Sequence, residues 1–550
     1  MTERILTALA WIVAAACVAP MLAAAIAALT GDLATWRGLA ATVLPGFARN
    51  TLVLVALVTL GVVAVGAGAA WLVTMYRFPG SRVLEVLLVL PLAFPAYVLA
   101  YAYTDILAHH GPVQSGLRAL TGWGPRDYWF PNLRSLPGAA AMFVCVLYPY
   151  VYLLARAAFA GQSATAYLAA RSLGRGPATA FLRVSLPMAR PAIAAGALLA
   201  VMETIADYGT VAHFAVPTFA TGIYQAWFAM QDRAAAAQLA LCLLAFALVV
   251  AAIERAQRGE ARAHLRGATL GTMEPARLAG LRGWAASFFC FLPVLVGFLA
   301  PVVILGRMAL RAGQSPFEPR YLGFLTNSLT LACMAAVVTV AGAVLIGHRA
   351  RTRPGRLARA LTLGAGLGYA VPGGVIAVGL LVPFAASDNA LDAFARAHFG
   401  VSTGLLVTGS LALLVLAYMS RFMAIALNAF DAGLATVSPN ADAVARTLGR
   451  SPPGVLRDVH LPILRPSLAT GALIVFVDVM KELPATLIMR PFNFDTLAVQ
   501  AYRLAADERL DQAAVPSLVI VAAGVLPVVL VCRAIAGRAR RPAADLAAPA

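Results

Sequence analysis

Five ionisable side chains lie inside two otherwise apolar stretches of this sequence. Glu203 and Asp207 are four residues apart in the first stretch, and Asp478, Lys481 and Glu482 occupy the matching place in the second. Residues i and i+4 of a helix lie on one face, so each pair of carboxylates is expected to project in one direction. Because a charge at the centre of a membrane helix costs about 2.5–3.5 kcal/mol to insert, such groups are candidates for function.

Two interpretations of these five residues remain open. Carboxylate oxygens are the ligands that hard cations prefer, so the four acids are candidate contacts along a pathway for a metal ion. Alternatively, the residues form structural ion pairs, since Lys481 follows Asp478 by three residues and can neutralise it across one helical turn. We therefore treat all five as candidate pathway residues and assign no metal site to them.

Other arrangements of reactive side chains are sparse. His109 and His110 are adjacent, but no third ligand accompanies them, and solvated histidines are the simpler interpretation. No combination of nucleophile, base and acid can be assembled from so few polar residues, so we expect neither an enzyme active site nor a cofactor bound by this chain. The six cysteines are scattered without a C-x-x-C pair and are expected to be packing residues.

The composition places these residues in a membrane protein. Apolar residues make up 61% of the 550 and charged residues only 12%, whereas soluble globular domains carry about 25% charged residues. The net charge is +18, and 41 of the 42 basic residues are arginine. Positive loops beside a membrane explain this charge better than nucleic-acid binding does, so we expect a lipid bilayer and no nucleic acid as the partner.

Twelve apolar stretches are long enough to cross a bilayer, for which about 20 helical residues are needed. The first stretch resembles a signal peptide, but its apolar run of about 25 residues is too long for one and favours a retained helix. The predicted fold is therefore an all-α polytopic membrane protein. The predicted spans are residues 5–29, 52–75, 83–107, 136–159, 192–213, 237–253, 284–305, 327–347, 361–384, 403–422, 468–487 and 513–532.

The arginines indicate the orientation of these spans. With the N-terminus in the cytoplasm, 28 arginines fall on the cytoplasmic side and 13 on the other side. Arg421 is counted among the cytoplasmic ones. An excess of basic residues in short cytoplasmic loops is the rule for membrane proteins, so both termini are predicted to be cytoplasmic.

The sequence contains an internal duplication. Residues 171–175 (Arg-Ser-Leu-Gly-Arg) match residues 446–450 (Arg-Thr-Leu-Gly-Arg), and the offset of 275 continues ungapped over about sixty residues. Earlier, Pro95 matches Pro372 at an offset of 277. Since each copy has six spans, an even number, the two copies form parallel repeats. We predict a first six-helix unit at 1–253, a cytoplasmic linker at 254–283 and a second six-helix unit at 284–550.

The segment between the fourth and fifth spans of each copy has a repeated pattern. The first copy has Gly174, nine further residues and then Val-Ser-Leu-Pro187, and the second has Gly449, nine residues and then Val-His-Leu-Pro462. A glycine C-cap predicts the end of a short helix, and the proline can start the next membrane helix. An arginine-bearing helix pair suits a groove on a soluble partner. A basic loop that contacts anionic lipid is the alternative, but it does not explain identical spacing in two copies.

This pattern resembles the E-A-A-x-x-x-G-x9-I-x-L-P signature of the inner-membrane permeases of binding-protein-dependent ABC importers. In that family the segment forms coupling helices that contact two ATPase subunits. The family's glutamate is Leu168 in one copy and Ala443 in the other, so Arg171 and Arg446 are expected to be the charged contacts here. The resemblance implies these ATPase-docking residues: Leu168, Ala169, Ala170, Arg171, Gly174, Val184, Leu186, Pro187, Ala443, Val444, Ala445, Arg446, Gly449, Val459, Leu461 and Pro462.

The resemblance also implies the partners. A phosphate-binding loop requires G-x-x-x-x-G-K-[ST], and the one lysine of this chain, Lys481, is not in such a motif. ATP would therefore be used by two copies of a separate cytoplasmic ABC ATPase subunit. A periplasmic binding protein would deliver the cargo to this transport subunit in the bacterial inner membrane.

The cargo is indicated by residues 481–487 and 490–498, which resemble the ferric-iron subgroup of these permeases. That subgroup also fuses two six-helix units into one chain. Fused permeases for thiamine, aminophosphonate or another small solute share this layout and remain an alternative. An ion-coupled secondary carrier is an alternative from another class. It would explain the acids within the membrane but not the twin loops.

Overall fold

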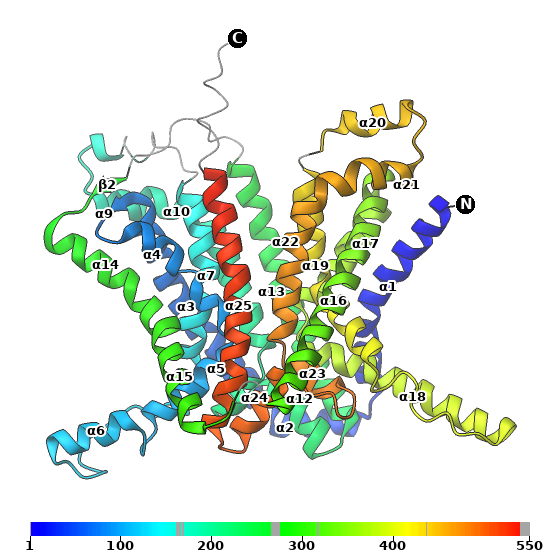
Figure 1. Cartoon of the computed structure of the whole chain (residues 1–550), viewed down its shortest axis with the longest axis horizontal. Coiled ribbons are helices and arrows are strands. Elements are labelled where there is room, and N and C mark those ends of the chain that lie inside the picture. The colour runs from blue at the N-terminus through cyan, green and yellow to red at the C-terminus, as the bar shows by residue number, and fades with distance from the viewer. Residues whose placement is uncertain are drawn as a thin grey trace. The chain divides into compact units, whose positions relative to one another are not determined.

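A computed structural model of the chain describes residues 2–160, 167, 170–265, 275–315, 318–435 and 437–539. Within these residues, eleven helices are long and apolar enough to cross a membrane, or up to twelve if a sharply bent pair counts as one span. The predicted all-α polytopic fold is confirmed (Figure 1). A two-residue parallel bridge joins β1 (Tyr76–Arg77) to β2 (Ala276–Arg277).

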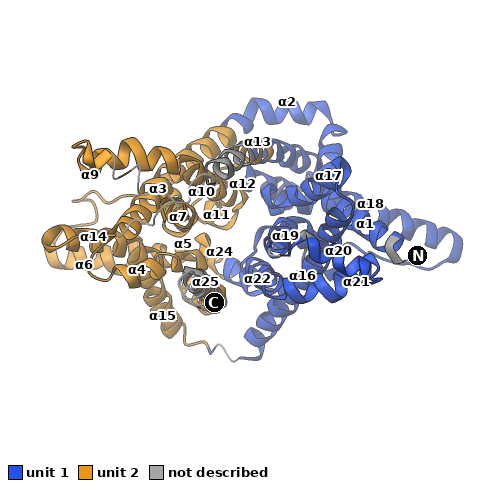
Figure 2. Ribbon diagram, turned by 90° about the horizontal axis from the view of Figure 1, so that it is seen from above, with its two compact units in different colours: residues 1–45, 219–247, 315–503 blue, residues 46–218, 248–314, 504–550 orange. Residues whose placement is uncertain are grey.

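The chain divides into two compact units, each built from three segments (Figure 2). Unit 1 contains residues 1–45, 219–247 and 315–503, and unit 2 contains residues 46–218, 248–314 and 504–550. Each unit therefore takes helices from both predicted halves of the chain. The boundaries predicted from the duplication, at 253 and 284, describe the repeat in sequence and differ from the boundaries of the compact units.

The helices of unit 1 come mainly from the second half of the chain. The early segment contributes α1 (Thr2–Leu29) and α2 (Leu33–Thr42), and the middle segment contributes α12 (Phe219–Tyr224), η3 (Gln225–Ala229) and the first part of α13 (Arg233–Leu265). The remaining elements are α16 (Pro319–Thr352), α17 (Arg356–Ala365), η5 (Gly366–Ala370), α18 (Gly373–Phe399), α19 (Leu411–Leu434), α20 (Pro439–Thr447), α21 (Pro452–Val455), η6 (Leu456–His460), α22 (Leu461–Met480), α23 (Pro484–Met489) and α24 (Leu497–Ala506).

The helices of unit 2 come mainly from the first half. They are α3 (Leu44–Met75), α4 (Ser81–Leu87), η1 (Leu90–Ala93), α5 (Ala96–Leu107), α6 (Pro112–Thr121), α7 (Leu136–Ala160), α9 (Pro177–Ala180), η2 (Phe181–Ser185), α10 (Leu186–Ala206), α11 (Gly209–His213), α14 (Gly280–Val294), η4 (Leu295–Leu299), α15 (Ala300–Ala312) and α25 (Leu510–Ala539). The first helices of the second half, α14 and α15, thus belong to the unit formed mainly by the first half.

Small residues allow the helices of each unit to pack closely. In unit 1, α1 lies against α16, α17, α18 and α19, and Cys17 and Ala14 join a buried cluster with Met423. In unit 2, α10 crosses α7 at Gly196, where an added Cβ would lie 2.7 Å from the Cα of Val151. Small residues at helix crossings let backbones approach closely, which is how helices associate in a medium without a hydrophobic effect.

The third predicted span is interrupted in both copies at the matched prolines. In unit 2, the helical segments 81–93 and 96–121 lie before and after Pro95, and the angle between them is 93°. In unit 1, η5 ends at Ala370 and α18 begins after Pro372. Proline has no N–H and forces the preceding residue into an extended conformation, so the helix stops there.

The tenth predicted span is displaced in the structure. The prediction was 403–422, but α19 runs from Leu411 to Leu434 because Ser410 caps its N-terminus by accepting a hydrogen bond from the N–H of Leu413. Arg421 therefore lies inside a membrane helix, where its side chain is buried, and not in a cytoplasmic loop. The count of cytoplasmic arginines is wrong for this residue.

The contact between α1 and α18 can be tested at Gly379. An alanine Cβ at this position would lie 1.9 Å from the carbonyl oxygen of Pro20, so the backbone of α1 would have to move. Gly379→Ala is expected to destabilise the protein by about 1–3 kcal/mol, as overpacking does. The measurement is the midpoint of thermal unfolding of the purified protein in detergent.

Gly323→Ala is the matched control, because no atom lies within 4 Å of a Cβ built there. Alanine favours a helix over glycine by up to about 1 kcal/mol, so the control is expected to unfold at the same or a slightly higher temperature. Equal midpoints for the two variants would contradict the proposed close packing of α1 on α18.

Candidate functional site

The first loop (residues 170–187) ends a short helical turn at Gly174. The N–H of Gly174 donates to the carbonyl of Arg171 (3.1 Å), and the N–H of Arg175 donates to the carbonyl of Ala170 (3.1 Å). Gly174 has a φ of +79°, a left-handed conformation that glycine adopts readily because it has no Cβ. These two bonds form a Schellman motif, so the predicted glycine C-cap is confirmed. The predicted docking residues Leu168 and Ala169 lie outside the described residues.

The second loop (residues 439–462) repeats this geometry. The N–H of Gly449 donates to the carbonyl of Arg446, and the N–H of Arg450 donates to the carbonyl of Ala445, both at 3.0 Å. The φ of Gly449 is also +79°. The duplication therefore preserves the backbone conformation of the glycine cap as well as the sequence pattern of the loop.

Each loop presents an apolar tip beside its glycine. Leu173 is 81% exposed and Leu448 is 76% exposed. Arg171 and Arg446 are exposed as well, whereas Ala445 faces inward. Exposed leucines on basic helices are suited to burial in a groove of another protein. On α20, the predicted docking residues Ala443 and Val444 share this exposed surface.

Leu173 and Leu448 were not among the predicted docking residues. The sequence held a signal for them, since the same leucine precedes the matched glycine in both copies. That signal was overlooked because leucine is common in membrane proteins and the family signature leaves this position unspecified.

The segment that follows each glycine leads directly into the fifth membrane helix. In unit 2, α9, η2 and α10 are contiguous from Pro177 to Ala206, and in unit 1, α21, η6 and α22 are contiguous from Pro452 to Met480. The α-helices α10 and α22 have Pro187 and Pro462 in their first turn, as predicted. Neither α-helix begins freely, however, because a π-helical turn directly precedes each one and makes the helix continuous.

The π-turns accommodate these prolines. A proline cannot donate an N–H to the preceding turn, so an α-helix is locally disrupted at such a residue. Here the N–H of Leu186 donates to the carbonyl of Phe181, and that of Leu461 to the carbonyl of Leu456, which widens the turn by one residue. The predicted docking residues Val184 and Val459 lie within these widened turns.

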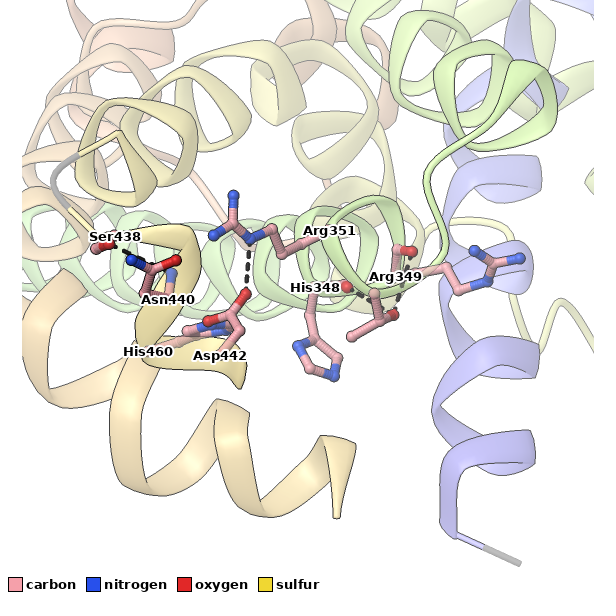
Figure 3. Close-up of polar contacts among 8 residues, drawn as sticks. His348, Arg349, Arg351, Ser438, Asn440, Asp442 and His460 are labelled. Atoms are coloured by element: carbon pink, nitrogen blue, oxygen red, sulfur yellow. Dashed lines mark hydrogen bonds and ion pairs between the residues drawn. The ribbon is translucent and has the colours of Figure 1, made fainter. Parts of the chain in front are cut away.

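A charged anchor holds the second loop to unit 1 (Figure 3). Asp442, in the first turn of α20, accepts hydrogen bonds from Arg351 Nε (2.9 Å) and His460 Nε2 (2.8 Å). Arg351 is at the end of α16, and His460, which is buried, is in η6. The ring of His460 packs edge-on against that of His348, with centroids 5.9 Å apart. The anchor therefore joins the loop to two membrane helices.

The charge of Asp442 determines the pH range over which this anchor works. Burial acts to raise the pKa of the carboxyl, but hydrogen bonds from His460 and Arg351 outweigh burial, and the pKa lies below its ordinary value of 3.8. A carboxyl whose pKa is lower in the folded than in the unfolded protein stabilises the fold at pH values above its unfolded-state pKa. This stabilisation is lost as the pH falls through the folded-state pKa. The carboxyl group of Asp442 is therefore ionised at neutral pH.

An aromatic anchor takes this place in the first loop. The ring of Trp71, near the end of α3, lies 4.3 Å from that of Phe181, 5.8 Å from that of Tyr167 and 5.4 Å from that of Phe159. Burial and the neighbouring Tyr167 raise the pKa of Tyr76, which also contacts Trp71, to about 12. Trp71 corresponds to His348 in the repeat, and Tyr167 corresponds to Asp442. The two loops are thus held by different chemistry at equivalent positions.

The fifth membrane helix of each copy is interrupted at a predicted pathway acid. In unit 2, α10 ends at Ala206, and Asp207 Oδ1 accepts a hydrogen bond from the N–H of Thr210 in α11 (2.8 Å). In unit 1, α22 ends at Met480, and Glu482 accepts the N–H of Ala485 (3.0 Å) and that of Thr486 (3.2 Å) in α23. Each carboxylate thereby satisfies donors in the first turn of the following helix.

These breaks correct one expectation. Glu203 and Asp207 were predicted to share a helix face, as were Asp478 and Glu482, but the helix ends between the members of each pair. Lys481, at the end of α22, forms the predicted ion pair with Asp478, with Nζ 2.9 Å from Oδ1. No group of three or more histidine, cysteine or acidic residues that could hold a metal ion occurs among the described residues.

Glu482 is the most enclosed of the five candidate pathway residues. Its carboxylate accepts a hydrogen bond from Tyr418 Oη (3.3 Å) and another from Thr486 Oγ1 (3.0 Å). An added Cβ on Gly373 would lie 2.5 Å from Glu482 Oε1 and 3.1 Å from Arg421 Nη1, so only glycine leaves room for both groups. Arg421 and Tyr418 were missed as members of this cluster.

Comparison with known proteins identifies the family. Residues 62–259 and 339–541 match the family described as "Binding-protein-dependent transport system inner membrane component". The chain belongs to this family. The match occurs once in each half, in agreement with the duplication, and covers both loops and both helix breaks.

Relatives of this permease include two proteins that match over most of its length. The Fe(3+)-transport system permease protein FbpB 2 of Haemophilus influenzae is 25% identical over 88% of both chains. The probable ABC transporter permease protein y4fN of Sinorhizobium fredii is 26% identical over 94% of this chain and 92% of its own length. The molybdenum transport system permease protein ModB of Escherichia coli K12 is 30% identical, but over 26% of this permease.

Substitution of Asp442 tests the charged anchor of the permease. Asp442→Asn retains the size of the side chain but removes the charge that Arg351 and His460 contact. Loss of hydrogen bonds to a charged group is expected to cost about 1.5–3 kcal/mol. The measurement is hydrogen–deuterium exchange of residues 439–447 at pH 7, which should become faster in the variant.

Asp458→Asn is the control within the same loop, since Asp458 pairs with Arg450 on the surface. Surface ion pairs contribute about 0–1 kcal/mol, so exchange should change little. If Asp442→Asn exchanged no faster than Asp458→Asn, the anchor would not hold the loop.

Proposed function

We propose that this permease is the membrane pathway of an ATP-driven importer for ferric iron. In this proposal a periplasmic binding protein delivers the iron, and two copies of a cytoplasmic ABC ATPase subunit dock on the two loops. Both termini are cytoplasmic. The observation that carries the proposal is the pair of loops with the same Schellman geometry, each with an exposed leucine and an exposed arginine.

The loops have the properties expected of a docking surface. A leucine that is about four-fifths exposed is unfavourable in water, and its burial in a partner's groove contributes about 1.5–3 kcal/mol. The arginine beside it can pair with an acidic group at the rim of such a groove. Since the two glycine caps have the same backbone conformation, one kind of ATPase surface would suit both loops, which supports a pair of identical subunits.

The charge distribution supports a cytoplasmic location for the loops. Arg351 bonds to Asp442, so the arginine-rich segment 349–359 lies at the same end of unit 1 as the second loop. The N-terminal end of α1 lies at that end as well (Figure 1). Basic residues concentrate on the cytoplasmic side of membrane proteins, which favours cytoplasmic loops and a cytoplasmic N-terminus.

The continuous helices provide a route for coupling. A displacement of the first loop would move a single helix that runs from Pro177 to Ala206 and ends at the break capped by Asp207. The second loop is connected in the same way, through Pro452 to Met480, to the break capped by Glu482. ATP-driven movement of the loops would therefore shift the breaks, where the carboxylates lie, and change the side from which the pathway is open.

Ferric iron is favoured as the cargo by a relative that matches most of the chain. The Fe(3+)-transport permease of Haemophilus influenzae covers 88% of this permease, whereas the molybdenum permease of Escherichia coli covers 26%. Another small solute, such as molybdate, thiamine or an aminophosphonate, is the second candidate. The ligand that copurifies with the cognate binding protein distinguishes these cargoes.

The docking proposal is tested by placing a charge on both tips. The double substitution Leu173→Asp and Leu448→Asp would put two carboxylates where apolar contacts are expected. We expect the variant to lose copurification with the ATPase subunits and to lose ATP-dependent iron uptake in proteoliposomes that contain all components. Since ΔΔG values for buried apolar contacts are about 1.5–3 kcal/mol each, binding should weaken by at least tenfold.

The control places aspartate at Gln231, an exposed polar residue that belongs to neither loop. Unchanged assembly and uptake in this variant would exclude a general effect of added charge. If the purified permease accumulated iron without ATPase subunits, driven by a proton or sodium gradient, the proposed function would be wrong.

The proposed pathway is tested at the two acids that do not cap a break. Glu203→Ala and Asp478→Ala are expected to reduce the rate of uptake, because Glu203 and Asp478 precede the breaks at matched positions. Thermal unfolding and ATPase copurification should remain normal in Glu203→Ala. Undiminished uptake in both variants would exclude these acids from the pathway and leave them a structural role.

A further inference from the structure

Each copy extends an arm from its unit between the third and fourth membrane helices. The first arm is residues 108–135 and contains α6, and the second arm is residues 383–410 and contains the final part of α18 and the segment that returns to α19. In Figure 1, α6 extends from unit 2 and α18 extends from unit 1. Both arms leave their unit at the end opposite to its loop (Figure 1).

The polar groups of the first arm bond to one another. Gln114, which is buried, donates to the carbonyl of Leu107 (2.9 Å) and accepts a hydrogen bond from Tyr128 Oη (2.8 Å). Arg118 donates to Tyr128 Oη (3.0 Å) and to the carbonyl of His109 (2.8 Å). The returning segment is therefore fastened to α6 by the polar side of the helix.

The apolar groups of the first arm point outward. Val113 and Leu120 are seven residues apart on α6, and therefore lie on one face, with Leu120 89% exposed. Trp129, in the returning segment, is 86% exposed, and Trp123 is also exposed. Two tryptophans and a leucine of the arm are therefore exposed, which is unfavourable for a segment surrounded by water.

The second arm is built in the same way from different residues. Asp388 accepts hydrogen bonds from the N–H groups of Val407 (3.1 Å) and Thr408 (2.7 Å). Asp392 accepts from the N–H of Thr403 (2.8 Å) and pairs with Arg396, whose Nε lies 2.7 Å from Oδ2. Both carboxylates are thus used to fasten the returning segment to α18.

The outer surface of the second arm is apolar as well. Phe394 is 52% exposed and Phe399 is 72% exposed. On the returning segment, Val401, Leu405 and Leu406 are also exposed. One exposed side of α18 carries alanine at 386, 390, 393 and 397.

We infer that both arms lie in the lipid interface on the side of the membrane opposite to the loops, with their aromatic residues at the level of the headgroups. Three observations favour lipid over water or a protein. Hydrogen bonds within each arm hold its returning segment, each arm exposes large apolar side chains (tryptophan and leucine in the first, phenylalanine and leucine in the second), and α18 is continuous with a membrane span. Tryptophan is enriched at the interface of lipid and water, and amphipathic helices bury their apolar face there.

The two arms would act as interfacial anchors. Each arm would fix the depth and the tilt of its own unit in the membrane. Because the same arrangement occurs in both copies with unrelated polar residues, the shared property is the outward apolar surface rather than any particular contact. This inference requires only that the chain is embedded in a membrane, so it does not depend on the cargo or the ATPase.

Tryptophan fluorescence of the full-length permease in nanodiscs tests the inference. The difference between the wild type and Trp129→Phe gives the signal of Trp129, and the variants Phe394→Trp and Asn389→Trp report on two faces of the second arm. We expect brominated phospholipid to quench Trp129 and Phe394→Trp, with little quenching by aqueous iodide. Asn389 is an exposed polar residue on α18, so the tryptophan of the Asn389→Trp variant should be quenched by aqueous iodide and little by brominated lipid.

Two results would overturn the inference. Quenching of Trp129 and Phe394→Trp by iodide and not by brominated lipid would place the arms in water. Protection from iodide that appears only when a periplasmic binding protein is added would identify the arms as a protein-docking surface. Gel filtration of each variant establishes that it is folded, and the Trp129 signal comes from a native residue.

Discussion

A helix that is interrupted within a bilayer exposes backbone N–H groups for which lipid offers no hydrogen-bond acceptor. The fifth membrane helix of each copy meets this constraint with an acid placed directly after the break. Asp207 accepts from one N–H group of the following helix and Glu482 accepts from two. Since an unsatisfied backbone group costs several kcal/mol in hydrocarbon, these carboxylates stabilise the breaks. The same residues that attract attention as candidate cargo contacts are therefore first of all structural.

The breaks and the loops are the two ends of one continuous helix in each copy. The helix between them passes through a π-turn, which accommodates a proline without interrupting the chain of helical residues. An element that is continuous between a surface loop and a break in the membrane transmits displacement rather than absorbing it. This continuity explains why the duplicated sequence keeps its glycine, its nine-residue spacing and its proline in both copies, although the side chains that anchor the two loops differ.

The sequence predicted the fold class, the duplication, the glycine caps and the ion pair between Asp478 and Lys481. These features follow from local rules, namely hydropathy, matched motifs and the spacing of residues along a helix. The position of Arg421 could not be predicted in this way. The charge of Arg421 was taken to mark a loop, although no glycine or proline near it indicates the end of a helix. Only the packing around Gly373, where Arg421 and Glu482 meet, shows what surrounds the arginine. The anchors were missed because each joins segments nearly one hundred residues apart.

The interleaving of the two units has a consequence for how the protein is made. Helix α1 is synthesised first, but the helices against which it packs, α16 to α19, follow some three hundred residues later. A polypeptide limited to the first half would thus contain α1 but not the helices against which α1 packs. Joining both halves in one chain turns this late encounter into an intramolecular step, favoured by a high effective concentration. The single chain therefore supplies α1 and the helices that it packs against together, in addition to an equal number of the two halves.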